Sequence, residues 1–190
     1  MANTNTPRGL VPLRDAGSKP HSGGVEMFYV PSTDASALYI GDPVVKNGSA
    51  SPEGVASVIL ATAGGAITGV VQGFMPNGTT DIVGYRAAST AAYVLVNTDP
   101  DTLYEIQEDG AGGQLAATNI GQNASFIHAA GNAYSKRSGV MLDSSTAATT
   151  AGLELKIVGL KQVPGNDFGA YAKFVVKINN STEANASAGI

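Results

Sequence analysis

The chain has 190 residues, a formal net charge of −4 and no cysteine, which excludes disulfides, thiolate metal ligands and a cysteine nucleophile. Charged residues make up only 14% of the sequence, compared with roughly 25% in average soluble domains. This weakly charged, net negative composition disfavours binding to a nucleic-acid backbone. Aromatic residues are scarce and tryptophan is absent, so we expect a core built from Val, Ile, Leu and Ala.

Residues 1–24 are rich in Pro, Gly, Asn and Ser and contain one short apolar patch. Their prolines exclude a continuous helix, so we predict an extended N-terminal arm. This arm is either a disordered tail or a segment that orders on a neighbouring subunit. The candidate anchors for such a neighbouring subunit are Leu10, Val11, Pro12 and Leu13. No apolar stretch has the form of an export signal or the length of a membrane span, so we expect synthesis in a cytoplasm and no membrane partner.

Residues 25–190 are predicted to form a single β-rich domain. The predicted strands are residues 25–30, 37–40, 43–46, 55–61, 67–74, 92–97, 103–108, 139–143, 153–157 and 173–178. The Asn-Gly pairs at 47–48 and 77–78 are predicted turns. About ten short strands with Gly- and Asn-containing turns indicate an all-β fold, either a jelly-roll-like sandwich or a small β-barrel.

The clearest alternation of apolar and polar residues lies near the C-terminus. Leu155 and Ile157 alternate with Glu154 and Lys156, and residues 173–178 repeat the pattern. A period of two in neighbouring segments predicts a β-hairpin with one face in a core, joined by a loop at residues 164–167.

Helical patterns are weak throughout the chain. We expect at most one short helical turn at residues 99–103, where Asp99 would cap it and Pro100 would take the first helical position.

The densest acidic stretch could in principle hold a cation or perform acid–base chemistry. It comprises Asp99, Asp101, Glu105, Glu108 and Asp109. On a strand, Glu105 and Glu108 would face opposite sides, so we expect a solvated rim rather than a metal site.

Other catalytic patterns are lacking. The glycines at 110–113 are not followed by the Lys and hydroxyl residue of a phosphate-binding loop, so we expect a flexible hairpin loop. His21 and His128 are not in a paired ligand pattern, and His128 is expected at the edge of a strand. No GxSxG nucleophile motif occurs. We therefore expect a protein that is not an enzyme and needs no cofactor or metal.

Five segments of the chain, taken in order, resemble the structural cement proteins that decorate the heads of tailed phages. They are residues 63–74, 93–109, 119–123, 138–146 and 155–160. The resemblance extends from about residue 25 to the C-terminus. It implies a virion protein on the outer surface of an icosahedral capsid, bound to the major capsid protein as a homotrimer and stabilising the shell. It also implies a β-rich, often jelly-roll-like fold with arms that reach across neighbouring subunits, and no catalytic residues.

Two other functions compete with this one. A receptor- or glycan-binding spike or fibre module would need an aromatic platform, to which Tyr85, Tyr93, Tyr104 and Tyr134 could contribute. A small nucleotide hydrolase on a trimeric β scaffold would need clustered acids and a basic phosphate clamp, and the sequence shows neither.

Overall fold

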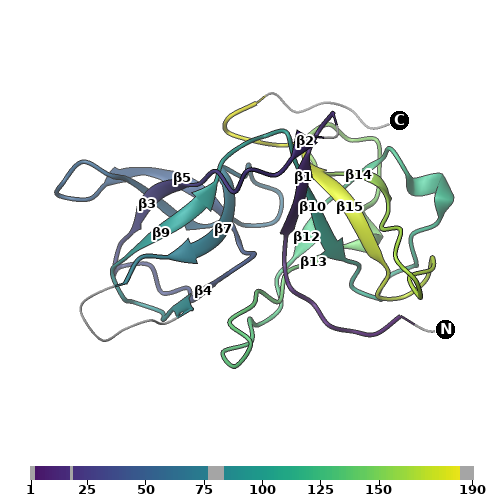
Figure 1. Ribbon diagram of the computed structural model, residues 1–190, viewed down its shortest axis with the longest axis horizontal. Helices are drawn as coiled ribbons and strands as arrows, with labels where there is room; N and C mark the ends of the chain where they lie inside the picture. Colours follow the sequence, from purple (N-terminus) through teal and green to yellow (C-terminus); the bar gives the residue numbers. More distant parts are fainter. Residues whose placement is uncertain (1–2, 18, 77–83, 185–190) are drawn as a thin grey trace.

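The computed structural model describes residues 3–17, 19–76 and 84–184, which form two β-rich halves lying side by side (Figure 1). One half is a closed five-stranded barrel, and the other is built on a six-stranded sheet. The predicted all-β fold is confirmed, with a small barrel as one of its two parts.

The barrel forms because its strands place branched apolar side chains on the inner face. In spatial order they are β3 (Glu26–Val30), β6 (Ala56–Leu60), β5 (Pro43–Ala50), β7 (Gly69–Phe74) and β9 (Ala92–Asn97). The barrel closes where β9 pairs antiparallel with both β3 and β7. Successive strand residues point to opposite faces, so alternate residues of β9 enter the interior. The buried residues of this core are Phe28, Val30, Leu38, Val44, Val58, Val71, Val94 and Val96.

The six-stranded sheet contains the predicted C-terminal hairpin. Its spatial order is β11 (Asn123–Ala124), β14 (Leu155–Leu160), β15 (Lys173–Ile178), β10 (Thr102–Gln107), β1 (Val11–Asp15) and β2 (Lys19–Pro20). β14 and β15 pair antiparallel, which confirms the hairpin. Phe174, Val176 and Ile178 are buried, whereas the alternating residues Lys173, Val175 and Lys177 are half-buried. This face covers the larger of the two hydrophobic cores.

Two short pairs of strands and two 3₁₀ turns complete the described chain. β4 (Leu38–Tyr39) pairs with β8 (Tyr85–Arg86), and β12 (Phe126–Ile127) pairs with β13 (Met141–Leu142). The 3₁₀ turns are η1 (Ala117–Asn119) and η2 (Ser144–Thr146). No helix in the described part of the chain has the length and apolar character needed to cross a membrane.

The two halves share a continuous contact. Ala61, Ile67 and Val70 of the barrel half pack into the core of the six-stranded sheet. The chain after β15 then runs along the barrel, where the Ile67 N–H donates to Asn180 O at 2.9 Å. An ion pair between Lys46 Nζ and Glu183 Oε1, 2.8 Å long, lies farther along this segment. The two halves are therefore joined by apolar packing and by the C-terminal segment. The six-stranded half includes β1 and β2, which the predicted boundary at residue 25 left outside the domain.

A buried arginine organises the loops beside the β4–β8 pair. The side chain of Arg86 is 0% exposed and forms an ion pair with Asp34. Burial lowers the pKa of its guanidinium, and the Asp34 carboxylate opposes that shift. Its nitrogens donate to the carbonyls of Pro31, Asp34, Ser36 and Thr90 and to the carboxylate of Asp34. One side chain thus joins two loops through their carbonyl oxygens, a role that the sequence did not suggest.

One local prediction is wrong, and another lies outside the described residues. Asn47-Gly48 is part of β5, where the register shifts between Lys46 and Ala50, so it forms a bulge rather than the hairpin turn. A positive φ, here 76° at Gly48, suits a bulge as well as a turn. Residues 99–102 form a tight turn, in which the Thr102 N–H donates to Asp99 O at 3.2 Å, and no helix follows. This is compatible with the expectation of at most one short helical turn there. The predicted turn at 77–78 falls in the segment that is not described.

Candidate functional site

The apolar patch predicted to anchor a free arm is part of the protein's own sheet. Leu10 is 1% exposed and belongs to the larger core, while Val11, Pro12 and Leu13 are half-buried in β1. β1 pairs antiparallel with β10, with Val11 opposite Glu105. The expectation of a separate arm is therefore wrong for this patch. Its partner strand is far away in the sequence, so the patch looks isolated when only local sequence is considered.

Gly9 allows the chain to enter the core at Leu10. Its φ of 68° is favourable only for glycine among ordinary residues, and a Cβ at this position would lie 2.4 Å from Gly41 O and 2.5 Å from Ser138 Cβ. The Leu10 N–H donates to Gly41 O at 2.9 Å. The entry of β1 is thus fixed against two other segments of the chain.

Residues 3–9, which we call the N-terminal segment, are attached to the six-stranded half by polar contacts. Asn3 Nδ2 donates to the carbonyl oxygens of Asp167 and Ala170. The Thr6 N–H donates to Gln107 Oε1 at 2.7 Å, and Gln107 Nε2 donates to Asn5 Oδ1 at 2.8 Å. These polar bonds hold the N-terminal segment in place. Its attachment therefore leaves no apolar pattern in the sequence.

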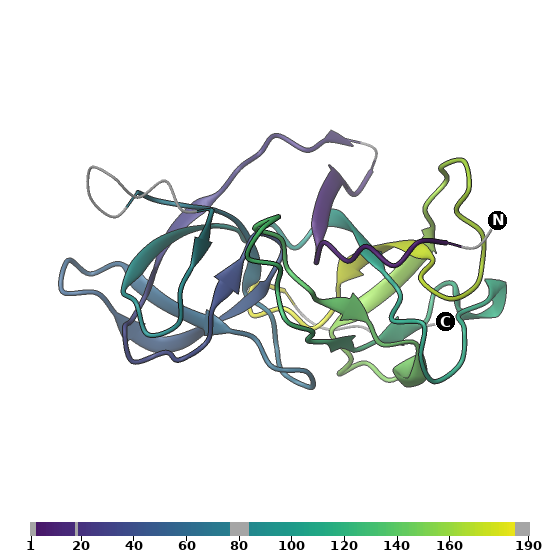
Figure 2. The same ribbon diagram turned by 90° about the horizontal axis from the view of Figure 1, so that it is seen from below.

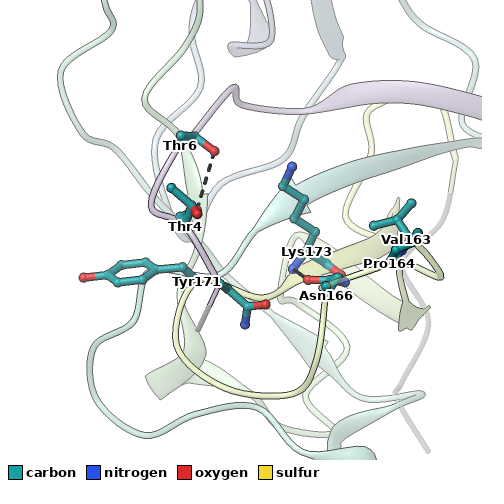
Figure 3. Close-up of a pocket in the computed structure, with 9 residues that line it drawn as sticks. Thr4, Thr6, Val163, Pro164, Asn166, Tyr171 and Lys173 are labelled. Atoms are coloured by element: carbon teal, nitrogen blue, oxygen red, sulfur yellow. Dashed lines mark hydrogen bonds between the residues drawn. The ribbon is translucent and has the colours of Figure 1, made fainter. Parts of the chain in front are cut away.

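A small pocket of about 160 Å³ separates the N-terminal segment from the loop between β14 and β15 (Figure 3). Asn166 lines it, but its amide donates to Lys161 O and Lys173 O and accepts from the Lys173 N–H. The side chain therefore closes the predicted loop at 164–167, and we assign this pocket a structural role.

Residues 128–140, which we call the projecting loop, connect β12 to β13 and extend away from the sheet beside the barrel (Figures 1 and 2). A layered stack holds the loop in place. The rings of Tyr39 and Tyr85 are parallel at 5.2 Å, and Lys136 Nζ lies 4.4 Å from the Tyr85 centroid. Gly131 packs on Tyr39 so closely that a Cβ there would lie 2.2 Å from the ring.

Backbone contacts also fix the projecting loop. The Ser138 N–H donates to Ile40 O at 2.9 Å, and His128 Nε2 donates to Ala61 O at 2.7 Å. His128 follows β12 directly, in keeping with its expected position at a strand edge. Asn132 Oδ1 accepts from the N–H groups of Tyr134 and Ser135. The loop therefore presents Tyr134, which is 96% exposed, on a constrained backbone.

The structure does not bring the four tyrosines considered for a glycan platform together. Tyr104 is completely buried, and the ring of Tyr93 packs on Tyr29 at 5.5 Å. Tyr85 is part of the layered stack with Tyr39 and Lys136, and of the four tyrosines only Tyr134 is fully exposed.

The acidic stretch is dispersed, but the predicted solvated rim is wrong for Glu108, which is buried. Glu105 lies on the outer face near Lys161 and Lys173, with N–O distances of 3.6 and 3.7 Å. Asp101 pairs with Lys177 at 2.6 Å, whereas Glu108 is buried. Within residues 3–17, 19–76 and 84–184, no three His, Asp or Glu side chains gather in a way that could hold a metal ion.

Two buried carboxyl groups were not expected from the alternation pattern. Glu154 is 0% exposed, although its neighbours in sequence suggested an outward position. It precedes β14 at the junction of the halves and accepts from the Gly64 N–H. Glu108 accepts from the Tyr171 N–H at 2.7 Å through Oε2, while its Oε1 has no hydrogen-bond partner among the described residues. Both groups connect distant loops, so only the folded chain explains their burial.

Glu108 gives the stability of the protein a predictable dependence on pH. Burial raises the pKa of its carboxyl above the ordinary value of 4.5, although the Tyr171 N–H opposes this shift. Folding favours the protonated form of Glu108. This contribution to the free energy of unfolding is fully present below the pKa of the unfolded chain, and it is lost as the pH rises through the higher pKa of the folded protein. Glu108→Gln keeps the side chain neutral, so its stability relative to the wild type should increase as pH rises, by about 1.4 kcal/mol for each unit of pKa elevation.

Urea unfolding at about pH 4, 6 and 8 measures this difference. Glu53→Gln is the control. The Tyr93 hydroxyl lowers the pKa of the exposed Glu53 carboxyl, so the stability of this variant relative to the wild type should change with pH in the opposite direction. A constant difference between Glu108→Gln and the wild type at all three pH values would contradict the assignment.

Comparison of the chain with protein-family models, with curated proteins and with solved structures found no match.

Proposed function

We propose that this protein is a non-enzymatic decoration protein that binds the outer surface of a tailed-phage head as a homotrimer and stabilises the shell of major capsid protein. The observation that carries the proposal is the ordered resemblance of five sequence segments, from residues 63–74 to residues 155–160. On this proposal the protein acts on the virion surface after synthesis in the bacterial host.

The use of polar side chains supports a structural role. Arg86 holds two loops, Glu108 holds the segment at Tyr171, and the lysines around Glu105 pair with it on the sheet surface. Each of these side chains therefore bonds to another part of the same chain. A repeated surface contact multiplied by trimerisation would supply affinity without a catalytic centre.

The contact surface that we propose is the projecting loop rather than the patch at Leu10. A Tyr side chain on a constrained loop offers a large contact area at a small entropic cost, which is typical of the residues that dominate interfaces. Tyr134 has both properties, whereas Leu10 is enclosed by its own core. The glycan-binding alternative is less favoured, because the stacked faces of Tyr39 and Tyr85 are already covered.

Co-sedimentation with expanded heads of the phage that encodes the chain, prepared without this protein, tests the proposal. We expect saturable binding by the wild type and a loss of about tenfold in affinity for Tyr134→Ser, the effect of removing one interface anchor. Val163→Ser, which alters another exposed apolar residue, should bind like the wild type. Absence of the wild-type protein from the sedimented heads would reject the proposed function.

A further inference from the structure

A pocket of about 380 Å³ lies between the N-terminal segment and the projecting loop. Segments that are far apart in the sequence form its two walls, and they lie next to each other in both views (Figures 1 and 2). Arg8 lines one wall and Arg137 lines the other, and both residues are exposed.

The two arginines have no acidic partner within the described residues. The described ion pairs account for other cations, namely His21, Lys46, Arg86, Lys161, Lys173 and Lys177. Asp42, the acidic residue near this wall, is buried, accepts from the Tyr39 N–H at 2.7 Å and lines a different pocket. Two unpaired guanidinium groups therefore flank one pocket in a protein whose net charge is −4.

The amide side chains of the pocket add donors rather than acceptors. The Oδ1 atom of Asn5 is occupied by Gln107, and the Oδ1 atom of Asn132 is occupied by two backbone N–H groups. Each amide therefore retains its nitrogen, which can only donate. Two permanently charged guanidinium groups and the amide donors are complementary to carboxylate oxygens.

The backbone of both walls is held in place before any ligand binds. Arg137 O accepts from the Asn132 N–H at 2.9 Å, and Gly9 and Leu10, next to Arg8, pack against Gly41. Binding would therefore order only side chains, which lowers its entropic cost.

We infer that this pocket binds an acidic segment of a partner polypeptide, with Arg8 and Arg137 pairing with carboxylates of that segment. Two local cations on a net negative protein suit a short acidic stretch, whereas a nucleic acid would meet repulsion over the rest of the surface. The inference concerns this pocket alone and does not depend on the proposed capsid role.

Fluorescence anisotropy with a labelled hexaglutamate peptide tests the inference, with hexaglutamine as the neutral control peptide. Saturable binding is expected for hexaglutamate only. Arg8→Gln and Arg137→Gln should each weaken it by about tenfold, because each removes a charge-assisted contact. Binding should also weaken as salt is raised. The matched control is Lys19→Gln, which removes an exposed positive charge in β2, beyond the opposite end of β1 from Arg8.

Localisation completes the test. Amide chemical shifts should change on peptide addition at residues 5–8 and 130–139. Equal weakening by Lys19→Gln, shifts spread over the surface, or equally tight binding of inorganic phosphate would each overturn the assignment to an acidic polypeptide. If the wild-type protein bound capsids but did not bind hexaglutamate, this inference would be rejected and the proposed function would stand.

Discussion

Replacement of Leu10 by alanine should lower the free energy of unfolding by about 2–5 kcal/mol, the range for truncating a fully buried leucine. Leu10 packs in the core of the six-stranded half, and the neighbouring Gly9 and Gly41 contacts leave the chain little room to collapse into a cavity. Thermal and urea unfolding measure the effect.

Leu13→Ala is the matched control, since it makes the same chemical change within β1 at a half-buried position where the register shifts. Its cost should be less than half that of Leu10→Ala. Equal, small costs for both variants would mean that the patch is not part of the core and would restore the free-arm interpretation. Deletion of residues 1–20 should likewise destabilise the sheet, because it removes Leu10 and β1 together.

Replacement of Arg86 by methionine should lower the free energy of unfolding by about 3–5 kcal/mol, because it leaves the largely buried Asp34 carboxylate without its ion-pair partner. The carbonyls that Arg86 now satisfies would also lose their donor. For a chain of this size, the expected fall in melting temperature is roughly 10 °C.

Two further variants separate the geometry of Arg86 from its charge. Arg86→Lys keeps the positive charge but lacks the planar fork of donors, so we expect it to recover only part of the stability. Arg14→Met makes the same substitution at an exposed position and should change stability by no more than about 0.5 kcal/mol. If Arg86→Met were as mild as Arg14→Met, the Arg86 hydrogen bonds would not be important for stability.

The sequence predicted the elements whose structure depends on neighbouring residues. The alternation in residues 173–178 and the apolar run at 92–97 correspond closely to β15 and β9. Alternation is a local property, because a strand turns successive side chains to opposite faces wherever it lies. The absence of cysteine and the low charge likewise needed no fold to interpret.

The tertiary structure decided which distant residues meet, and this changed the candidate site. Leu10 belongs to a core because β10 lies beside it, and Arg86 is satisfied because the loops at Asp34 and Thr90 converge on it. Arg8 and Arg137 share one pocket only after β1 has docked and the projecting loop has been clamped. Local sequence patterns do not specify these contacts, because burial and charge pairing depend on residues that are distant in the sequence. The sequence by itself therefore determined an all-β chain without a recognisable catalytic motif, and the folded chain determined which distant residues are buried together, paired or exposed side by side.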